Sequence, residues 1–222
     1  MRHFEEQLDD LRKRLLAMSG LVESAIYRSI LALIEKDEDQ ANLVLQNESR
    51  INQMEIEIDE QATRLLALDQ PVAADLRFIT ATIKINSNLE RMGDLAVNIA
   101  ERALSLMHEP VLNTVIDIPH MANLVESMVR KALDAFVQKD AELARSVLLS
   151  DDAVDEMRDL IYRKLVSYMQ QDPRSVPQGI DFIFVARNLE RVADHATNIA
   201  EDVIFLVEAK DVRHHHLEAE TK

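Results

Sequence analysis

The chain has 222 residues, of which 47% are hydrophobic, so it is long enough to bury a core and is not a disordered chain. Its formal net charge of −15 excludes a protein that grips nucleic-acid phosphates, because that binding depends on Lys and Arg. Cysteine is absent, which excludes disulfides and thiolate metal sites. Only three Gly and five Pro interrupt a composition rich in helix-forming residues, which predicts an all-α protein.

Apolar residues at helical spacing predict six long helices joined by short polar turns. Pro71 suits the first turn of a new helix and not the middle of an old one, so the second helix is expected to end there. The two prolines of "EPVLNTVIDIP" mark the connection between the two halves of the chain. The expected helices cover residues 4–35, 41–70, 72–108, 121–137, 141–169 and 179–207.

The second half of the chain repeats the first. "LVES" occurs at Leu21 and again at Leu124, and "NLERMGDLAVNIAE" from Asn88 recurs as "NLERVADHATNIAE" from Asn188, with ten identities in fourteen positions. Matches in the same order along successive helices indicate a duplicated unit. We therefore predict two tandem pseudo-symmetric three-helix bundles, over residues 1–109 and 118–210, followed by a C-terminal tail over residues 211–222.

Acidic and amide side chains form a stripe along one face of several predicted helices. At about 100° per residue, the stripe residues of each helix fall within one narrow sector. Like charges four residues apart destabilise a helix, so an ordinary solvated face would alternate their signs. The stripes of the first repeat are Glu48, Asn52, Glu55 and Asp59 on the second helix and Glu90, Asp94, Asn98 and Glu101 on the third. Those of the second repeat are Asp151 and Asp155 on the fifth helix and Glu190, Asp194, Asn198 and Glu201 on the sixth.

If two stripes face each other, their oxygen atoms converge as hard cations require, which predicts a metal site in each repeat. The alternative is a pair of wet polar faces, with Arg91 and Arg191 offsetting part of the repulsion. Oxygen ligands suit Mg, Mn, Ca or iron and discriminate poorly among them. Glu55 and Asp59 correspond to Arg158 and Tyr162, so the second site is expected to differ in its ligand count.

Other features give little support to catalysis or membrane insertion. No Gly-rich phosphate loop, paired nucleophile and base, or Glu-x-x-His pair occurs, so we expect a protein that is not an enzyme. The charged N-terminus predicts a cytoplasmic protein without direct membrane insertion. His195 is a candidate outer-shell group beside Asp194, and the histidines at 214–216 are assigned to the tail.

The repeated segments resemble the PhoU family of phosphate-uptake regulators. The resemblance covers nearly the whole chain and is carried by "QPVAADLRFITATIKINSNLERMGD" at 70–94 and "ARNLERVADHATNIAED" at 186–202. It implies two symmetry-related three-helix bundles whose Glu/Asp-x-x-x-Asp motifs hold iron or zinc on the surface. Glu90 with Asp94 and Glu190 with Asp194 match these motifs directly, as does Asp151 with Asp155. Asn52 departs from the pattern, since an Asp is expected there.

The resemblance also implies a function. A family member would be a negative regulator of phosphate uptake and of the phosphate-starvation response, bridging a phosphate-specific ABC transporter and a sensor histidine kinase. A homodimer is compatible with this role. The alternative from the residues alone is a metal-dependent hydrolase or metal-storage protein that uses the same carboxylate stripes.

Overall fold

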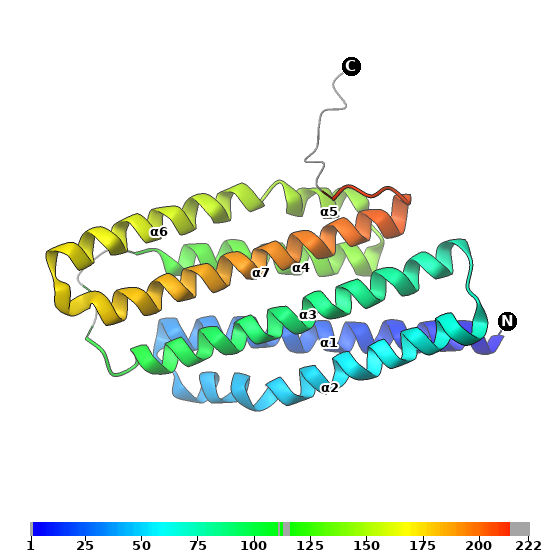
Figure 1. Ribbon diagram of the computed structural model, residues 1–222, viewed down its shortest axis with the longest axis horizontal. Coiled ribbons are helices and arrows are strands. Elements are labelled where there is room, and N and C mark those ends of the chain that lie inside the picture. Colours follow the sequence, from blue (N-terminus) through cyan, green and yellow to red (C-terminus); the bar gives the residue numbers. More distant parts are fainter. Residues whose placement is uncertain (1, 111, 113–115, 214–222) are drawn as a thin grey trace, which may run out of the picture.

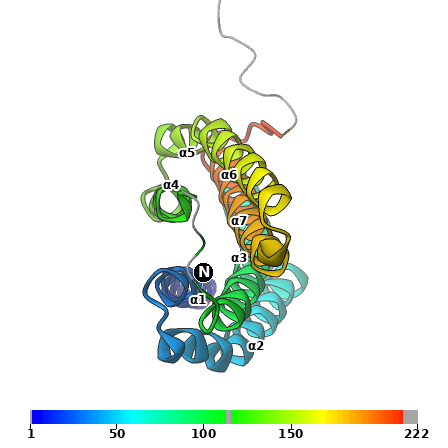
Figure 2. The same ribbon diagram turned by 90° about the vertical axis from the view of Figure 1, so that its left-hand side faces the viewer.

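The computed structural model describes residues 2–110, 112 and 116–213, so most of the expected tail, with its three histidines, lies outside the described residues. Within the described part the chain forms helices and no strands, and six long helices build two three-helix bundles that lie side by side (Figures 1 and 2). This confirms the predicted all-α fold. The elements are α1 (Arg2–Glu35), α2 (Glu38–Asp69), α3 (Ala73–Leu106), α4 (Ile118–Gln138), α5 (Ala141–Leu148), α6 (Asp151–Gln171), the 3₁₀ helix η1 (Pro173–Ser175) and α7 (Val176–Glu208).

A Lys-Asp pair forms the first helix junction of each repeat. Lys36 and Lys139 adopt left-handed conformations with φ of 54° and 53°, which end α1 and α4. The next residue then caps the following helix: the Asp37 side chain accepts from the backbone N–H groups of residues 39 and 40, and that of Asp140 from those of residues 142 and 143. The pair recurs because it both stops one helix and starts the next.

The predicted fifth helix, over 141–169, is wrong in one respect: it is divided into α5 and α6 at Leu149 and Ser150. The Ser150 hydroxyl donates to the Ser146 carbonyl oxygen at 2.9 Å, and the Ser150 N–H donates to the Val147 carbonyl oxygen at 2.9 Å. Serine side chains that bond to nearby carbonyls compete with the helical pattern. Asp151 then begins α6, where negative charge is favourable.

Helix α2 begins three residues earlier than expected, after the Asp37 cap, and two helices of the second repeat also begin earlier than expected. α4 starts at Ile118 because the Asp117 carboxylate accepts from the His120 N–H at 3.1 Å. α7 starts at Val176, since Pro177 is tolerated in the first turn, where its missing N–H has no helical partner to lose. These differences arise from cap chemistry, which apolar periodicity does not detect.

α3 and α7 form the junction between the repeats and run beside each other through the middle of the molecule (Figures 1 and 2). Lys84 Nζ of α3 lies 3.0 Å from Asp202 Oδ1 of α7. Near the other end, Arg102 Nη1 of α3 lies 3.2 Å from Asp181 Oδ1 of α7. The buried apolar side chains of both repeats belong to one continuous core, so the two bundles pack against each other in addition to being connected by the chain.

α1 contains an 18-residue window with a mean hydropathy of 1.4, so by length and composition it is apolar enough to cross a membrane. This is weak support for a membrane span, because a core helix passes the same test. The apolar stripe of α1 includes Leu11, Leu15, Met18 and Val22, which are fully buried. Packing against α2, α3 and α4 accounts for its apolar character.

Candidate functional site

Glu55 and Asp59 of α2 face Glu90 and Asp94 of α3, and we call these four residues the first acidic cluster. The fully buried Asn86 fixes the register: its Nδ2 donates to the Glu55 carbonyl oxygen and to Asp59 Oδ1, both at 2.9 Å. Two of the predicted stripes therefore meet, and they come from antiparallel helices joined by one short turn.

Burial and mutual repulsion both raise pKa values in the first acidic cluster. Burial, followed by the charges of Asp59 and Asp94, raises the pKa of Glu55. Burial, followed by the charges of Asp94 and Glu55, raises the pKa of Glu90. Arg91 opposes both shifts without cancelling them. The cluster thus holds more negative charge than its surroundings neutralise, which is the electrostatic condition that favours a bound cation.

Tight packing beside the cluster brings α2 and α3 together. A methyl group added to Gly93 would meet Ile51 side-chain atoms at 3.2 and 3.3 Å. In the second repeat the equivalent residues are Ala193 and Val154, both buried. The pair therefore exchanges a small and a large residue for two intermediate ones, which conserves volume at this contact.

The second acidic cluster consists of Asp151 and Asp155 of α6 with Glu190 and Asp194 of α7. Desolvation, followed by the charges of Glu190, Asp151 and Asp155, raises the pKa of Asp194 to about 6, although the residue as a whole is exposed. The second pair of predicted stripes therefore also meets.

A guanidinium group lies among the carboxylates of the second repeat. Arg158 Nη1 is 2.7 Å from Glu190 Oε1 and 3.0 Å from Asp155 Oδ1, and Arg158 Nη2 is 3.0 Å from Asp159 Oδ1. The equivalent residue in the first repeat is Glu55. The sequence predicted that the two sites would differ in ligands; the structure adds that the replacement is a cation in contact with the remaining carboxylates.

The other predicted stripe residues lie farther along the same helices. Because α2 and α3 are antiparallel and Ile51 lies against Gly93, Asn52 lies near the level of Asp94, and Glu48 lies about one turn farther toward Asn98. In the second repeat Asn198 Nδ2 lies 3.5 Å from Asn88 Oδ1, so its amide is turned toward the junction with α3. Glu201 lies two helical turns beyond Asp194 on α7.

The carboxylates of the first acidic cluster are suitable metal ligands by type, but their side chains are not arranged around a common metal position. As the side chains stand, no group of three or more Asp, Glu or His in the described part of the chain is arranged to hold a metal ion. The donor set of the first acidic cluster nevertheless fits a hard cation, because it offers only carboxylate oxygens that repel one another. The donor set of the second acidic cluster does not fit a hard cation in the same way, since the Arg158 guanidinium already contacts two of its carboxylates.

His195, considered as an outer-shell group, bonds across the junction between the repeats. Its Nδ1 lies 2.9 Å from Asn88 Oδ1. Burial, followed by the charges of Arg191 and Arg91, lowers the pKa of His195 to about 4, so the ring is neutral at pH 7. A neutral imidazole that bonds to Asn88 links α3 to α7.

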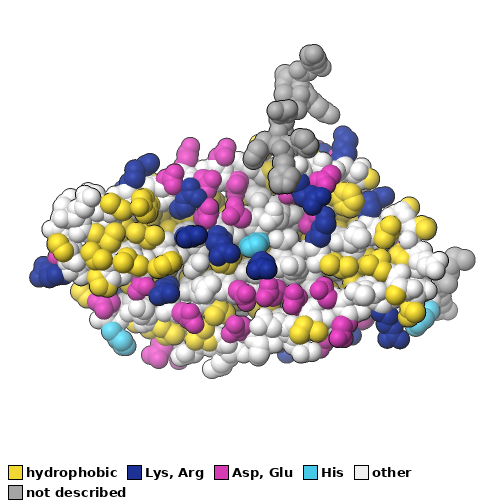
Figure 3. All heavy atoms as spheres, viewed as in Figure 1, with side chains coloured by type: hydrophobic (Ala, Val, Ile, Leu, Met, Phe, Trp, Pro, Cys, Tyr) yellow, Lys and Arg dark blue, Asp and Glu magenta, His cyan; other side chains and the backbone are white. Residues whose placement is uncertain are grey.

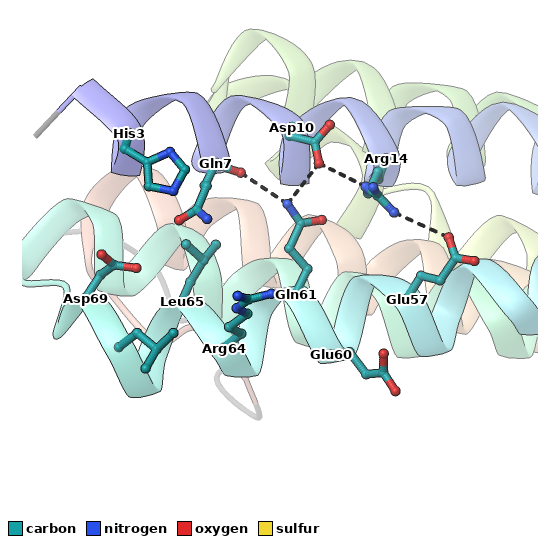
Figure 4. Close-up of a pocket in the computed structure, with 11 residues that line it drawn as sticks. His3, Gln7, Asp10, Arg14, Glu57, Glu60, Gln61, Arg64, Leu65 and Asp69 are labelled. Atoms are coloured by element: carbon teal, nitrogen blue, oxygen red, sulfur yellow. Dashed lines mark hydrogen bonds and ion pairs between the residues drawn. The ribbon is translucent and has the colours of Figure 1, made fainter.

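A groove of about 550 Å³ lies elsewhere, between the start of α1 and the end of α2 (Figure 4). Gln61 Nε2 donates to Asp10 Oδ2 at 3.0 Å, and Arg14 bridges Asp10 at 3.0 Å and Glu57 at 3.3 Å. The hydrogen bond from Arg14 lowers the pKa of Asp10. Nothing in the sequence pattern indicates this groove, because it forms where two helix ends far apart in the sequence pack together.

Comparison with known proteins agrees with the geometry. The family model described as PhoU domain matches residues 15–103 and 118–203. A phosphate-specific transport system accessory protein PhoU homolog from Pseudomonas aeruginosa is 44% identical over 96% of this chain and 88% of its own length. One from Aquifex aeolicus is 40% identical over 98% of each chain.

Solved structures resemble the whole fold. The crystal structure of PhoU from Pseudomonas aeruginosa superimposes with a TM-score of 0.90 and 43% identity, covering 93% of this chain and 100% of that one. The phosphate transport system regulatory protein PhoU from Streptococcus pneumoniae superimposes with a TM-score of 0.87 and 31% identity, covering 94% of this chain and 99% of that one. The family model, the sequence relatives and the solved structures agree, and the chain belongs to the PhoU family.

Proposed function

We propose that this chain is an accessory protein of a phosphate-specific transport system that represses phosphate uptake and the phosphate-starvation response when phosphate is plentiful. The observation that carries the proposal is similarity over nearly the full length to proteins described as phosphate-specific transport system accessory proteins. A solved relative is also described as a regulatory protein of phosphate transport. On this proposal the chain acts in the cytoplasm by bridging a phosphate ABC transporter and a sensor histidine kinase.

The face formed by α3, α6 and α7 suits the docking of partners. Asp and Glu side chains gather along α3 and along α6, and basic side chains with a histidine lie between them (Figure 3). Arg91 and Arg191 both act on His195 and so lie near this band. Charge of alternating sign over one broad face favours selective docking, because a partner must match both signs.

We further propose that the first acidic cluster binds a cation, with iron or zinc expected from the family and Mg or Mn from the ligand chemistry. Glu55, Asp59, Glu90 and Asp94 would supply the oxygen ligands after small side-chain rotations. A bound cation would neutralise the carboxylate repulsion that, after burial, raises the pKa values of Glu55 and Glu90. Asn86 would orient Asp59 from behind, as outer hydrogen bonds commonly do for ligating carboxylates.

The regulatory role is tested by expression of a phosphate-starvation reporter in phosphate-rich medium. Cells without the chain should show high expression, and the native chain should restore low expression. A chain carrying Asp94→Ala and Asp194→Ala tests the clusters, and Asp134→Ala, an exposed change on α4 outside both clusters, is the matched control. Low expression without the chain would remove the regulatory proposal.

The metal-dependent hydrolase predicts a different result: turnover of a phosphate ester by the metal-loaded protein, lost in the Asp94→Ala variant. The described surface gives it little support. Its larger grooves, of about 550 Å³ between α1 and α2 and about 610 Å³ between α4 and α6, are lined by residues outside both acidic clusters. A hydrolase needs its metal ligands beside a substrate cavity.

A further inference from the structure

We infer that Arg158 is a built-in cation that replaces a metal ion in the second acidic cluster, so that only the first repeat of this chain takes a metal. This inference rests on the metal binding proposed above for the first cluster. It differs from the family expectation, in which the motifs of both repeats hold metal.

The contacts of Arg158 carry the inference. Its guanidinium reaches carboxylates on two helices: Asp155 and Asp159 on its own helix α6, and Glu190 across the helix pair on α7. Arg158 Nη1 donates to Glu190 Oε1 at 2.7 Å and Nη2 donates to Asp159 Oδ1 at 3.0 Å, both as charge-assisted hydrogen bonds, and the contact with Asp155 at 3.0 Å is an ion pair. Planar guanidinium donors satisfy several carboxylates at once, which a hydrated lysine ammonium does less well. Arg158 therefore does between α6 and α7 what a cation would do between α2 and α3.

The same positions of the first repeat are built differently. Glu55 corresponds to Arg158 and Asp59 to Tyr162, so the second repeat loses two carboxylates from this helix and gains a positive charge. Asn86, which holds Asp59, corresponds to Ala186 and leaves no amide there to orient a ligand.

All three replacements disfavour a metal in the second repeat. The positions of both α2 ligands and of the asparagine that orients one of them have changed, although Glu190 and Asp194 still match Glu90 and Asp94. A divalent ion entering the second cluster would have to displace Arg158 and would meet its charge at short range. Leaving Asp155 and Glu190 without Arg158 would in turn leave their repulsion uncompensated.

Metal content of the purified chain tests the inference. The native protein and its variants are stripped with chelator, dialysed against Mn²⁺ or Zn²⁺ and assayed by elemental analysis. Asp94→Ala should lose most of the bound metal, while Asp194→Ala should retain it. The mirror change Glu55→Arg should abolish binding in the first repeat.

Rebuilding the first cluster in the second repeat is the sharper test. The triple variant Arg158→Glu, Tyr162→Asp, Ala186→Asn reproduces the residues of the first cluster, so bound metal should rise about twofold over the native chain. Arg158→Gln, which removes the charge and keeps a polar side chain, should lower the urea midpoint of the metal-free protein. That measurement tests the counter-ion role even if the triple variant fails to fold.

Two results would overturn the inference while leaving the regulatory proposal intact. The first is a native chain that loses about half its metal with Asp194→Ala, as expected if both repeats bind equally. The second is an Arg158→Gln chain with an unchanged urea midpoint. A native chain that binds no metal would instead contradict metal binding by the first cluster, and with it the contrast between the repeats, whereas the reporter experiment would still decide the regulatory role.

Discussion

The two acidic clusters lie on equivalent helix pairs of two homologous repeats, and Glu90 and Asp94 match Glu190 and Asp194. One cluster nevertheless contains only carboxylates, whereas the other surrounds Arg158, which stands at the position of Glu55. The helices that carry them pack in the same antiparallel way, as the Asn86 contact to Asp59 and the Arg158 contact to Glu190 show. Duplication therefore preserved the backbone that brings the stripes together and allowed the charge balance to diverge. A shared fold within one chain does not imply a shared ligand.

The largest effect is expected at the junction between the repeats, where each end is closed by a different ion pair. Lys84→Met should destabilise the chain by about 2 kcal/mol, because the Asp202 side chain is only 7% exposed and would lose its hydrogen-bonded partner, leaving only the charge of Arg213 nearby. Burial already raises the pKa of Asp202. A raised folded pKa makes stability increase as pH falls, so the loss should shrink at acidic pH. Urea unfolding at several pH values measures both.

Arg102→Met is the matched change at the other end. Each base also lies over an aromatic ring, Lys84 at 5.4 Å from the centre of Phe205 and Arg102 at 5.2 Å from that of Phe184, so the ring contact is lost in both variants. Asp181, however, keeps the Ser105 hydroxyl at 2.9 Å. The cost should therefore be about half that of Lys84→Met. Equal costs would contradict the view that the hydrogen bond remaining from Ser105 relieves Asp181.

The next prediction concerns the pH dependence of stability that arises from Asp194 in the second acidic cluster. The folded pKa of Asp194 is about 6 against an ordinary value of 3.8, so its ionisation opposes folding above about pH 6 and the penalty is relieved as pH falls toward 3.8. Asp194→Asn should raise the stability of the metal-free protein near pH 7.5 and remove this part of the pH dependence. Urea midpoints at about pH 7.5 and 5.5 for both proteins measure it.

His195 opposes that trend and needs its own control. Its folded pKa of about 4 lies below the ordinary 6.5, so stability present above pH 6.5 is lost as pH falls toward 4. His195→Leu installs the residue found at the equivalent position, Leu95, and removes this loss. If His195→Leu leaves the pH dependence of stability between pH 6.5 and 4 unchanged, the assignment to His195 fails, and an unchanged dependence in Asp194→Asn would remove the assignment to Asp194.

A smaller effect is expected at the contact beside the first cluster. Ile51→Val should cost about 1 kcal/mol in the native chain, but almost nothing when Gly93→Ala is also present, since the added methyl fills the vacated space. The double variant reproduces Val154 and Ala193 of the second repeat. A double-mutant cycle by urea unfolding measures the coupling free energy between residues 51 and 93. Additive changes in stability would show that the two side chains do not share the same space.

The smallest effect is expected at the repeated Lys-Asp junctions. Lys139→Gly should stabilise the chain by about 0.5 to 1 kcal/mol, because glycine adopts the left-handed conformation without strain. Lys36→Gly should gain less, since Lys36 Nζ also donates to the carbonyl oxygens of Met107 at 3.3 Å and Glu109 at 3.0 Å. Thermal unfolding of the two variants side by side ranks them, and a larger gain at Lys36 would contradict this difference.

Much of the fold followed from apolar periodicity and from the internal repeat. Apolar periodicity is a local signal, and the repeat is found by comparing the chain with itself. The caps at Asp37 and Asp140 occupy equivalent places in the two repeats and agree with both signals. The break at Leu149 and Ser150 escaped them, because the apolar pattern runs on while serine hydroxyls bond to nearby carbonyls. The stripes were visible as residue spacing, but their meeting depends on how α2 packs on α3 and α6 on α7.

The sequence by itself determined the all-helical character, the duplication, the family and the residues available to each acidic cluster, since these depend on composition, spacing and repetition. Only the tertiary structure decided which of those residues meet and what neutralises them. Arg158 in the sequence is one changed ligand position, and its contacts with Asp155 and Glu190 make it a counter-ion. His195 likewise lies next to Asp194 in the sequence but bonds to Asn88 on the other repeat. Electrostatic partners are set by distances across helix pairs, which no spacing along a single helix contains.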